Sequence, residues 1–598
     1  MTPETLQKAY QALTTGRPDE TLRMLEGGPP ALPVLLLRGG ALASLERHEE
    51  AAEAFEGVLR LEPEQHAAAY NLAVCQQALG RFHAARKTLE RVLKAQPGNL
   101  DAMLTLSAVL SEIGTGEERE ALLQAAIAQA PDDRRFRHNL AYLYYQMERY
   151  EEAVGLTEAI AKAHPEDAAA FDLLGTICLT QGKQQNSRPL LEDAVRYFEQ
   201  ALRLDPARMA IRINLGNTLN ALHDSARALS LFQELAGAAP DRLDVHQGMG
   251  MALLNLGRLA EARTCFEAAT ACDPEAAESQ YQLAVVSLAL GDYETGSRKF
   301  EWRWRIRKTP RWRSRNAPLW DGGAIPEGRL LIWSEQGLGD ELLHYGWAGQ
   351  LQARGIAVAL ESDARLVPLL ARSFPDAQVF PKDDPRLLDL ADSDVAAQCP
   401  SGDLLLRTRP WERPPDQAVR YLQSDSVRRA HFAERLAALH SGRKIGISWF
   451  SKGSGLGFGK SVPLDRWRAT LGGRDALFVN LQYGDSEAEF EAVCRASEAA
   501  HYCDPDLDRR EDIEGLCALI DSLDLVITVS NVTAHFAGAL GKPCWVLLGP
   551  DPLWHWGRQG ETAPFYASIT TLRASELGGW DGVLAAAAER LDGLLSER

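Results

Sequence analysis

The turn Glu335-Gln336-Gly337-Leu338-Gly339-Asp340 carries the first residues whose types and spacing could do chemistry. It follows an apolar run and opens a predicted helix, so Gly337 and Gly339 permit a tight turn and a close approach of the backbone. The carboxylate of Asp340, delivered to a cleft at this place, is a candidate general base. The alternative is that Asp340 only caps the helix, which is a frequent role of aspartate at helix starts.

Three later segments predict a site for an anion. A loop rich in glycine, serine and lysine spans 451–464, and residues 480–484 follow the next apolar run. The run 524–529 leads into Ser530 and then a helix, whose first N–H groups and positive dipole end favour an anion. The candidate binding residues are Ser451, Lys452, Lys460, Gln482, Ser530, Asn531, Val532, Thr533 and His535. Lys460 could instead be a solvated lysine, and His535 a hydrogen-bonded core histidine.

Short strands that alternate with amphipathic helices must position these segments. The predicted strands are 329–334, 356–360 and 444–450, and the predicted helices are 339–354 and 364–374. Such alternation predicts parallel sheets with crossover helices. Two of these α/β units, joined near Tyr421 and Leu422, would leave a cleft between their strand ends, where ligands of doubly wound sheets bind.

The first half of the chain is a repeat array. Prolines recur every 34 residues at Pro63, Pro97, Pro131 and Pro165 and, after one interval of 41, at Pro206, Pro240 and Pro274. A 34-residue period is the tetratricopeptide signature. The turns within each helix pair are predicted at Gly80, Gly114, Glu148, Gly182, His223, Gly257 and Gly291. The large residues Phe55, Leu89, Phe198, Phe232 and Phe266 recur in phase with the small residues Ala51, Ala85, Ala153, Ala194, Ala228 and Ala262. Small residues let paired helices approach, and large ones fill the gap that remains.

The 41-residue interval inserts seven residues between Gly182 and Pro206. Seven residues are nearly two helical turns, so the apolar stripe downstream stays in phase. The polar run 181–189 predicts a lengthened loop followed by a helix start at Ser187 and Pro189. This loop could contact the second domain or an acceptor, and a neutral surface insertion is the alternative.

Asparagines recur at one position in the first helix of several repeats. They are Asn71, Asn139 and Asn214, and the corresponding residues in other repeats are Leu37, Thr105, Leu173, Gly248 and Gln282. The position resembles that of the asparagine ladder in protein O-linked N-acetylglucosamine transferases, whose amides bind a peptide backbone. The resemblance implies acceptor binding on the concave face of the repeats. Asparagine is also frequent there in ordinary repeats, so a purely structural role is the alternative.

The motifs together resemble one fused class of bacterial proteins. The turn at 337–340, the helix start Ser-Asn-Val-Thr-Ala-His at 530–535 and Gly-Ala-Leu-Gly-Lys-Pro at 538–543 look like those of proteins that join tetratricopeptide repeats to a heptosyltransferase-like glycosyltransferase. The resemblance covers nearly the whole chain. It implies an all-α repeat solenoid followed by an α/β GT-B domain, which consists of two Rossmann-like subdomains with a cleft between them. Some members are flagellin glycosyltransferases that transfer a nonulosonic acid such as pseudaminic acid.

The resemblance also implies roles for individual residues. Asp340 matches the proposed general base, Lys460 matches a cation near the donor phosphates, and the segment 531–535 matches the donor-binding helix start. Heptosyltransferases have aspartate where this chain has Ser530, so the donor is expected to differ from an ADP-heptose. No metal is expected, because GT-B enzymes usually rely on basic residues and a helix dipole, and the carboxylates at 504–508 are interpreted as a solvated loop.

The overall composition argues against several other classes of protein. The net charge of −18 argues against a protein that coats nucleic acid. Nine scattered cysteines without a CxxC motif indicate neither a disulfide framework nor a zinc site. No apolar run reaches the ~18 residues of a membrane span, and the start of the chain, Met1-Thr2-Pro3-Glu4-Thr5, is unlike a secretory signal, so we expect no membrane span and a cytoplasmic location.

These observations predict four segments and one function. The predicted segments are a solenoid of about eight repeats at 1–300, a Trp/Arg-rich joint at 301–326, an N-terminal subdomain at 327–425 and a donor-binding C-terminal subdomain at 426–598. The expected activity is metal-independent, inverting transfer of a sugar to serine or threonine of an acceptor protein such as flagellin. The co-substrate is a nucleotide sugar, for which a CMP-nonulosonic acid is one candidate. The alternative is a repeat scaffold or nucleotide-sugar sensor without catalysis, which the Ser530 departure favours.

Overall fold

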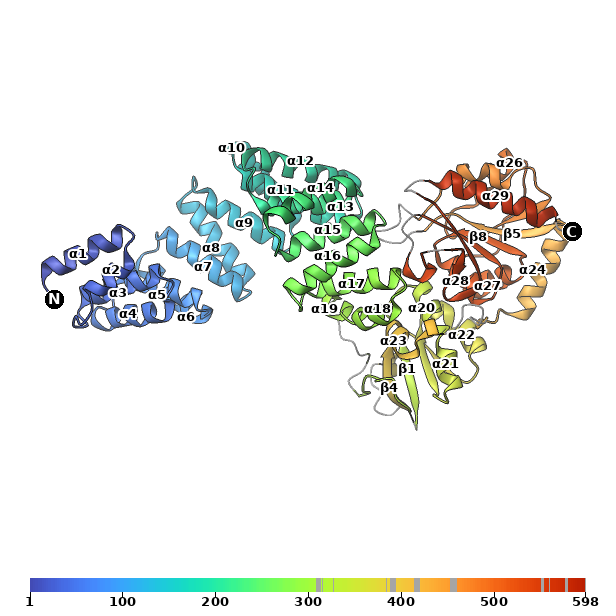
Figure 1. Ribbon diagram of the computed structural model, residues 1–598, viewed down its shortest axis with the longest axis horizontal. Coiled ribbons are helices and arrows are strands. Elements are labelled where there is room, and N and C mark those ends of the chain that lie inside the picture. Colours follow the sequence, from blue (N-terminus) through green and yellow to red (C-terminus); the bar gives the residue numbers. More distant parts are fainter. Residues whose placement is uncertain are drawn as a thin grey trace. The chain divides into compact units, whose positions relative to one another are not determined.

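The structure is a computed structural model of the 598-residue chain (Figure 1). It describes residues 1–307, 313, 316–325, 327–382, 384–387, 394–412, 420–451, 460–549, 553–558, 560–575 and 579–596. The chain divides into two compact units, Met1–Leu215 and Gly216–Arg598. The functional boundaries predicted at 300, 326 and 425 stay predictions.

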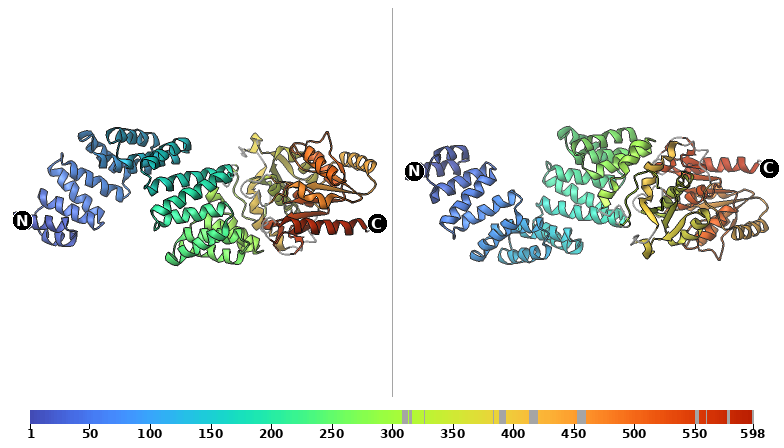
Figure 2. Two further views of the ribbon diagram at one scale, coloured as in Figure 1. Left: turned by 90° about the horizontal axis from the view of Figure 1, so that it is seen from above. Right: turned by 90° about the horizontal axis from the view of Figure 1, so that it is seen from below.

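The first unit is made of antiparallel helix pairs, as Figure 2 shows in blue to teal. Its helices are α1 (Pro3–Thr14), α2 (Pro18–Met24), α3 (Leu32–Ser44), α4 (His48–Leu61), α5 (His66–Ala78), α6 (Phe82–Ala95), α7 (Leu100–Glu112), α8 (Gly116–Gln129), α9 (Arg134–Gln146), α10 (Tyr150–Ala163), α11 (Ala168–Gln185) and α12 (Arg188–Leu204). α13 (Met209–Ala221) begins in this unit and ends in the second.

Small residues on one helix face a buried aromatic ring on its partner. A Cβ on Gly39 of α3 would lie 2.8 Å from the ring of Phe55 on α4, and one on Gly175 of α11 would lie 2.7 Å from Phe198 on α12. The repeating alanines and large residues of the sequence pattern are buried. The small–large packing predicted from the repeat is therefore confirmed.

The predicted turns are confirmed except at the insertion. Gly80, Gly114, Glu148, His223, Gly257 and Gly291 all have positive φ between their paired helices. Gly182 does not, because it lies inside α11, packed against Leu191, and the left-handed residue is Asn186 with φ 51°. The predicted lengthened loop is wrong: the extra residues extend α11 to 18 residues and α12 to 17, while the predicted start of α12 at Ser187 and Pro189 is correct.

The second unit begins with further repeat helices. They are α14 (Ser225–Ala238), α15 (Leu243–Asn255), α16 (Leu259–Cys272), α17 (Ala277–Ala289), α18 (Tyr293–Phe300) and the short α19 (Arg303–Arg307). Ala284 and Leu288 of α17 and Phe300 of α18 belong to the same hydrophobic core as Leu330 and Ile332 of the first sheet. The last repeat and the α/β region thus share one core.

The first sheet has four parallel strands in the order β3-β2-β1-β4. Its elements are β1 (Arg329–Trp333), β2 (Val358–Ser362), β3 (Gln378–Pro381), β4 (Val395–Pro400), α20 (Leu338–Tyr345), α21 (Ala348–Ala353), η1 (Ala364–Leu366), α22 (Val367–Ser373), η3 (Ser401–Asp403) and α23 (Leu404–Thr408). The helix predicted at 339–354 is two helices, and Tyr421 packs on Gly346 between them and donates a hydrogen bond to the carbonyl of Leu342 (2.6 Å).

The second sheet has seven strands in the order β10-β11-β9-β8-β5-β6-β7, parallel except for β10. Its elements are α24 (Ser426–Leu439), β5 (Arg443–Ser448), α25 (Arg468–Leu471), β6 (Ala476–Asn480), α26 (Glu487–Ala496), β7 (Ala500–Tyr502), α27 (Ile513–Asp521), β8 (Leu525–Val529), α28 (Val532–Ala539), β9 (Cys544–Leu548), η8 (Trp554–Trp556), β10 (Thr562–Ala563), β11 (Tyr566–Arg573) and α29 (Trp580–Ser596). α26 and α29 cover one face, and α27 and α28 cover the other (Figure 1). The predicted parallel sheets with crossover helices are confirmed.

Candidate active site

The strand orders define where a ligand can enter each sheet. In the first sheet β1 lies between β2 and β4, and in the second β5 lies between β6 and β8. In each sheet, the strands that follow this first strand are therefore added first on one side of it and later on the other side. Crevices form at such switch points, beyond the carboxyl ends of the strands. The segments at those ends are 334–337 and 401–403 in the first sheet, and 449–451 and 530–531 in the second. Ser451, Ser530 and Asn531 lie at these places, and Asp340 and Thr533 lie in the helices that follow.

Asp340 lies in the first turn of α20, where its negative charge interacts favourably with the helix dipole. The N-cap residue is Gly337, which has no side chain to cap the helix, and both catalysis and capping stay predictions for Asp340. The neighbouring Glu341 is fully buried and anchors α20: it accepts hydrogen bonds from Ser362 Oγ (2.7 Å) and the Asp363 N–H (3.2 Å) and pairs with Lys382. The contacts of Glu341 therefore hold in place the helix turn that carries Asp340.

Gly339 lets the two sheets' helices touch. A Cβ at Gly339 would lie 2.9 Å from Cδ2 of His535, so α20 and α28 pack backbone against ring. The close approach predicted for the glycines is confirmed for Gly339. At Gly337 it is wrong, because φ is −77° and the nearest atom to a Cβ would be Asp340 Oδ2 at 3.8 Å.

Asn531 ties the ends of β5 and β8 together. As the N-cap of α28 it accepts from the Thr533 N–H (3.0 Å), and its amide donates to Ser448 Oγ (2.7 Å) and to the carbonyl of Phe450 (3.1 Å). Gln482 Oε1 accepts from Ser448 Oγ (2.9 Å) and from two backbone N–H groups beyond β5. Both side chains thus hold the crevice in shape, and direct donor contact stays a prediction for them.

A cavity of about 280 Å³ occupies this crevice. It is lined by Leu338, Arg365, Ser451, Tyr483, Arg509, Arg510, Ile513, Leu516, Asn531, Val532 and Thr533. Four of these were predicted from the sequence: Ser451, Asn531, Val532 and Thr533. Leu338 belongs to α20, two residues from Asp340, and Arg365 follows β2, so both sheets contribute to the cavity.

Three arginines that the sequence patterns did not indicate surround the cavity. Arg365 donates to the carbonyl of Arg510 (3.0 Å), so the first sheet contacts the loop before α27. Arg509 is buried, donates Nε–H to the carbonyl of Gln482 (2.9 Å) and pairs with Glu487. Burial lowers the pKa of Arg509, yet its guanidinium remains a cation. Three guanidinium groups beside a helix N-terminus favour an anion, but each is also paired with a carboxylate: Arg365 with Asp363, Arg509 with Glu487 and Arg510 with Glu511.

Two buried polar atoms at this cavity have no hydrogen-bond partner within the described part of the chain. They are Oγ1 of Thr533, whose residue is 1% exposed, and Nη1 of Arg509, whose residue is 5% exposed. An unsatisfied buried group costs roughly 1–3 kcal/mol. Both residues line the cavity, so a ligand with acceptor oxygens would satisfy them.

Asp340, Lys460 and His535 lie within electrostatic reach of one another. Burial lowers the pKa of Lys460, and the charge of Asp340 opposes that shift. Burial, with a smaller contribution from Lys460, lowers the pKa of His535 to about 3, and its Nδ1 is 2.9 Å from the Tyr566 hydroxyl. His535 is therefore neutral near pH 7, is buried and hydrogen-bonded, and lies against Gly339 of the Asp340 turn; donor binding by His535 stays a prediction.

The remaining predicted residues lie in other surroundings. Ser530 Oγ accepts a hydrogen bond from Trp556 Nε1 (2.9 Å), so its hydroxyl is engaged in packing. Lys452 lies outside the described residues. Among the repeat asparagines, Asn71 is exposed and Asn139 is half-buried, whereas Asn214 donates to Asp172 Oδ1 (3.5 Å) of the preceding repeat. Acceptor binding by these three asparagines stays a prediction.

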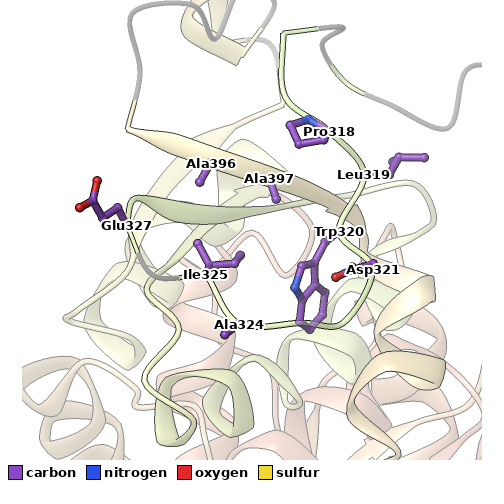
Figure 3. A pocket seen from close by; sticks show the side chains of 9 residues that line it. All are labelled: Pro318, Leu319, Trp320, Asp321, Ala324, Ile325, Glu327, Ala396 and Ala397. Carbon is purple, nitrogen blue, oxygen red and sulfur yellow. The ribbon is translucent and has the colours of Figure 1, made fainter.

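A second hollow of about 530 Å³ lies elsewhere on the first sheet (Figure 3). Trp320, Ile325 and Ala397 give it an apolar lining, with Asp321 and Glu327 as its acidic groups. It borders the residues before β1 and the start of β4, hence the amino ends of the strands. Ligands of parallel sheets bind at the opposite ends, so this hollow is not part of the candidate site.

The described ranges contain no cluster that could hold a metal ion, only free cysteines, and no helix suited to cross a membrane. No group of three or more His, Cys, Asp or Glu side chains there could hold a metal ion. All nine cysteines are free, and only Cys272 is exposed. None of the helices that the structure describes combines the length and the apolar character that a membrane crossing requires.

Comparisons with known proteins identify the repeats and one long relative. Tetratricopeptide-repeat models match residues 42–110, 120–177, 219–285 and, with a second model, 190–242. The chain is 29% identical over 490 residues to Protein FlbA of Caulobacter vibrioides, which covers 78% of this chain and 80% of that protein. It is 26% identical over 173 residues to the Protein O-mannosyl-transferase TMTC3 of Homo sapiens, which covers 28% of this chain and 18% of that protein and is confined to the repeats.

Solved structures resemble the repeats. A tetratricopeptide repeat protein from Parabacteroides merdae is 15% identical and covers 42% of this chain and 97% of its own, with a TM-score of 0.37. YrrB, described as a tetratricopeptide protein with an unusual peptide-binding site, is 22% identical and covers 31% of this chain and 92% of its own, with a TM-score of 0.25. By the family models, the chain contains tetratricopeptide repeats, and it is similar to FlbA over most of its length; an α/β region follows the repeats.

Proposed function

We propose that this protein is a glycosyltransferase of the GT-B fold that transfers a sugar from a nucleotide donor to a hydroxyl of an acceptor protein held by the repeats. The observation that carries the proposal is the cavity between the two sheets. It joins three arginines, the N-terminus of α28 and two unsatisfied buried polar atoms to the turn that bears Asp340. A phosphate of the donor matches the first three features, and an attacking hydroxyl matches the last.

The chemical step is a direct displacement. Asp340 accepts the proton of the acceptor hydroxyl while its oxygen forms a bond to the anomeric carbon, and the bond from that carbon to the donor phosphate breaks. The leaving phosphate keeps the bonding electrons, and Arg509, the α28 N-terminus and Lys460 stabilise its charge. The configuration at the anomeric carbon inverts. Neutral His535 lies against Gly339 and keeps the turn in place.

The identities of donor and acceptor belong to the same proposal. The donor is a nucleotide sugar, with a CMP-nonulosonic acid as the first candidate, and the acceptor is a serine or threonine of a protein such as flagellin. The engagement of Ser530 by Trp556 supports a donor other than an ADP-heptose, because the residue that matches the heptosyltransferase aspartate is used for packing. The similarity to TMTC3 does not reach the cavity and adds nothing about the chemistry.

The second candidate is a nucleotide-sugar sensor that binds in the same cavity without turnover. The packed Ser530 hydroxyl favours it, because the residue that matches the heptosyltransferase aspartate makes a structural contact with Trp556. Calorimetry with CMP-, UDP-, GDP- and ADP-sugars identifies the donor class for either candidate. Incubation of the bound donor with acceptor protein separates them, since only the transferase increases the acceptor's mass.

Asp340→Asn tests the assignment of the general base. We expect it to lower the rate of acceptor modification by about 10²–10⁴-fold, because proton transfer by a positioned side chain contributes that much. Intact-mass analysis of the acceptor over time gives the rate. Asp581→Asn is the matched control, because Asp581 also lies in the first turn of a helix but is exposed and pairs with Arg466. Equal rates for the two variants would contradict the role of Asp340.

A further inference from the structure

A buried ion cluster lies where the repeats end. Arg303 of α19 is 2% exposed, and the side chains of Glu335 and Asp403 are equally buried. Nε of Arg303 donates to Glu335 Oε2 (2.9 Å), and Nη2 donates to Asp403 Oδ1 (2.7 Å). Nη1 donates to the carbonyl of Phe300, the last residue of α18 (2.9 Å). One side chain thus contacts the repeat end and two separate segments of the first sheet.

Those two segments form the switch point of that sheet. Glu335 stands between β1 and α20, five residues before Asp340, and Asp403 belongs to η3, directly after β4. The carboxylate of Glu335 also accepts the Gly402 N–H (3.0 Å), and a Cβ on Gly402 would lie 2.6 Å from Glu335 Oε1. The cluster therefore joins the carboxyl ends of β1 and β4, and Glu335 packs so closely on Gly402 that a larger residue at 402 would clash with it.

Stability alone does not account for this cluster. Burial by itself would lower the pKa of Arg303, but the two carboxylates outweigh that effect and raise it, so the guanidinium remains charged. A buried ion cluster is on average no more stabilising than well-packed apolar residues, because desolvation offsets the attraction. Its advantage is geometric, since a guanidinium fixes the direction of each carboxylate.

We propose that Arg303 is a positioning residue that aligns the Asp340 turn with the end of the repeat array. The inference rests on the proposed function. Arg303 contacts neither donor nor acceptor; it holds Glu335, and the turn carries that constraint to Asp340. Loss of the guanidinium geometry lowers the rate of transfer but leaves donor binding at the α28 cavity unchanged, because Arg303 is not among the residues that line that cavity.

Arg303→Lys keeps the charge and loses the fork that bonds both carboxylates. The matched control is Arg305→Lys, because Arg305 lies on the same helix but is exposed, pairs with Glu275 and stacks over Trp302 (4.2 Å). For Arg303→Lys we expect kcat for acceptor modification to fall at least tenfold with KM for the donor unchanged. Hydrogen exchange should rise in a peptide covering 334–342 and not in one covering 525–540. The control should match wild type in all of these measurements.

Three outcomes overturn the inference: an exchange pattern for Arg303→Lys equal to that of Arg305→Lys, an exchange increase spread over the whole chain, or a fall in kcat matched by a rise in donor KM. If wild type transfers no sugar, the proposed function fails, while the exchange data still decide whether Arg303 fixes the turn. Should Arg303→Lys fail to fold, Glu335→Gln takes its place, because it keeps the side chain's size and removes only its charge.

Discussion

Thr533 and Arg509 carry the most direct indication of a ligand at the scale of single residues. Folded proteins satisfy the great majority of buried polar atoms, and these two unsatisfied atoms belong to residues that line one cavity. The arrangement is preorganised: the groups stand in place before a ligand arrives, so little ordering is needed on binding.

Thr533→Val should separate ligand binding from stability. Valine keeps the shape and removes the unpartnered hydroxyl, so we expect the free energy of unfolding to stay the same or rise by up to about 1 kcal/mol. Affinity for the donor should fall about tenfold, because a hydrogen bond to a charged phosphate contributes roughly 1.5–3 kcal/mol. Thermal unfolding and calorimetry measure the two effects.

Thr528→Val is the matched control for that substitution. The Thr528 hydroxyl is also buried, but it donates to Asn531 Oδ1 (3.1 Å), so its loss breaks a hydrogen bond that is already made. We expect this variant to lose stability by about 1 kcal/mol. A Thr533→Val variant that loses as much stability as Thr528→Val, with unchanged affinity, would contradict a ligand-facing role.

Acid should destabilise the fold through its buried histidines. Burial lowers the pKa of His344 and of His535 to about 3, from an ordinary value near 6.5. Between those values the unfolded chain binds more protons than the folded one, so stability falls as pH falls. Each histidine contributes up to about 1.4 kcal/mol per pH unit. Burial raises the pKa of Glu361 to about 7, which acts in the opposite direction between about pH 4.5 and 7, but it is one group against three, because burial also lowers the pKa of His555.

His344→Gln should therefore weaken the pH dependence of stability. Urea unfolding at pH 7 and pH 5 should show that the variant loses about 1–2 kcal/mol less than wild type across this interval. His83→Gln, at an exposed histidine, is the control and should behave as wild type. An unchanged slope for His344→Gln would show that its imidazole is not held neutral by the fold.

Sequence could predict the acidic and helix-start residues but not the arginines. Asp340 and the segment 530–535 are adjacent to strand patterns, and a local motif is enough to place them. Arg365 and Arg509 enter the cavity from segments about 145 residues apart, and no local pattern distinguishes them from surface arginines. Only the tertiary contact between the two α/β regions brings Arg365 and Arg509 to the same cavity.

At the scale of elements, the contact between α20 and α28 fixes the cleft. Gly339→Ala should destabilise the protein by about 1–3 kcal/mol, because a Cβ 2.9 Å from His535 forces the two helices apart. Gly155→Ala is the control, since Gly155 is exposed in α10 with nothing within 4 Å, and alanine there should stabilise by about 0.5–1 kcal/mol. Denaturant unfolding measures both, and equal effects would contradict tight packing at Gly339.

At the element scale, the helix pairs could be predicted from the repeat, because the same repeat position is buried against the same neighbouring helix in each unit. The insertion after Gly182 escaped prediction for a physical reason. Polar residues with a glycine suggest a loop, but Gly182 packs against Leu191 of the partner helix, and the turn moves to Asn186, an asparagine that tolerates the left-handed region. Tertiary packing thus overrides the local preference at this hairpin.

At the scale of the whole molecule, the boundary between the two compact units does not coincide with the end of the repeat helices. The division at Leu215 and Gly216 leaves the later repeat helices in the unit that contains both sheets. Ala284, Leu288 and Phe300 are part of the sheet core, and Tyr293 stacks on Trp411 with ring centroids 5.8 Å apart. The last repeat therefore has a structural role in addition to any role in acceptor binding.

Two truncations should separate these roles. A chain of residues 206–598 keeps the second compact unit and should fold, bind the donor and hydrolyse it slowly. It should modify the acceptor at least tenfold more slowly than the full chain, because it lacks the other repeats, which the proposed function assigns to acceptor binding.

A chain of residues 301–598 loses Leu288 and Phe300 from the core, each worth roughly 1.5–3 kcal/mol of burial, and should unfold at a much lower temperature. Thermal unfolding, calorimetry with the donor and intact-mass analysis distinguish the two chains. Undiminished acceptor modification by residues 206–598 would mean that the acceptor binds the later repeats or the cleft alone, and equal unfolding temperatures would mean that the last repeat is not part of the sheet core.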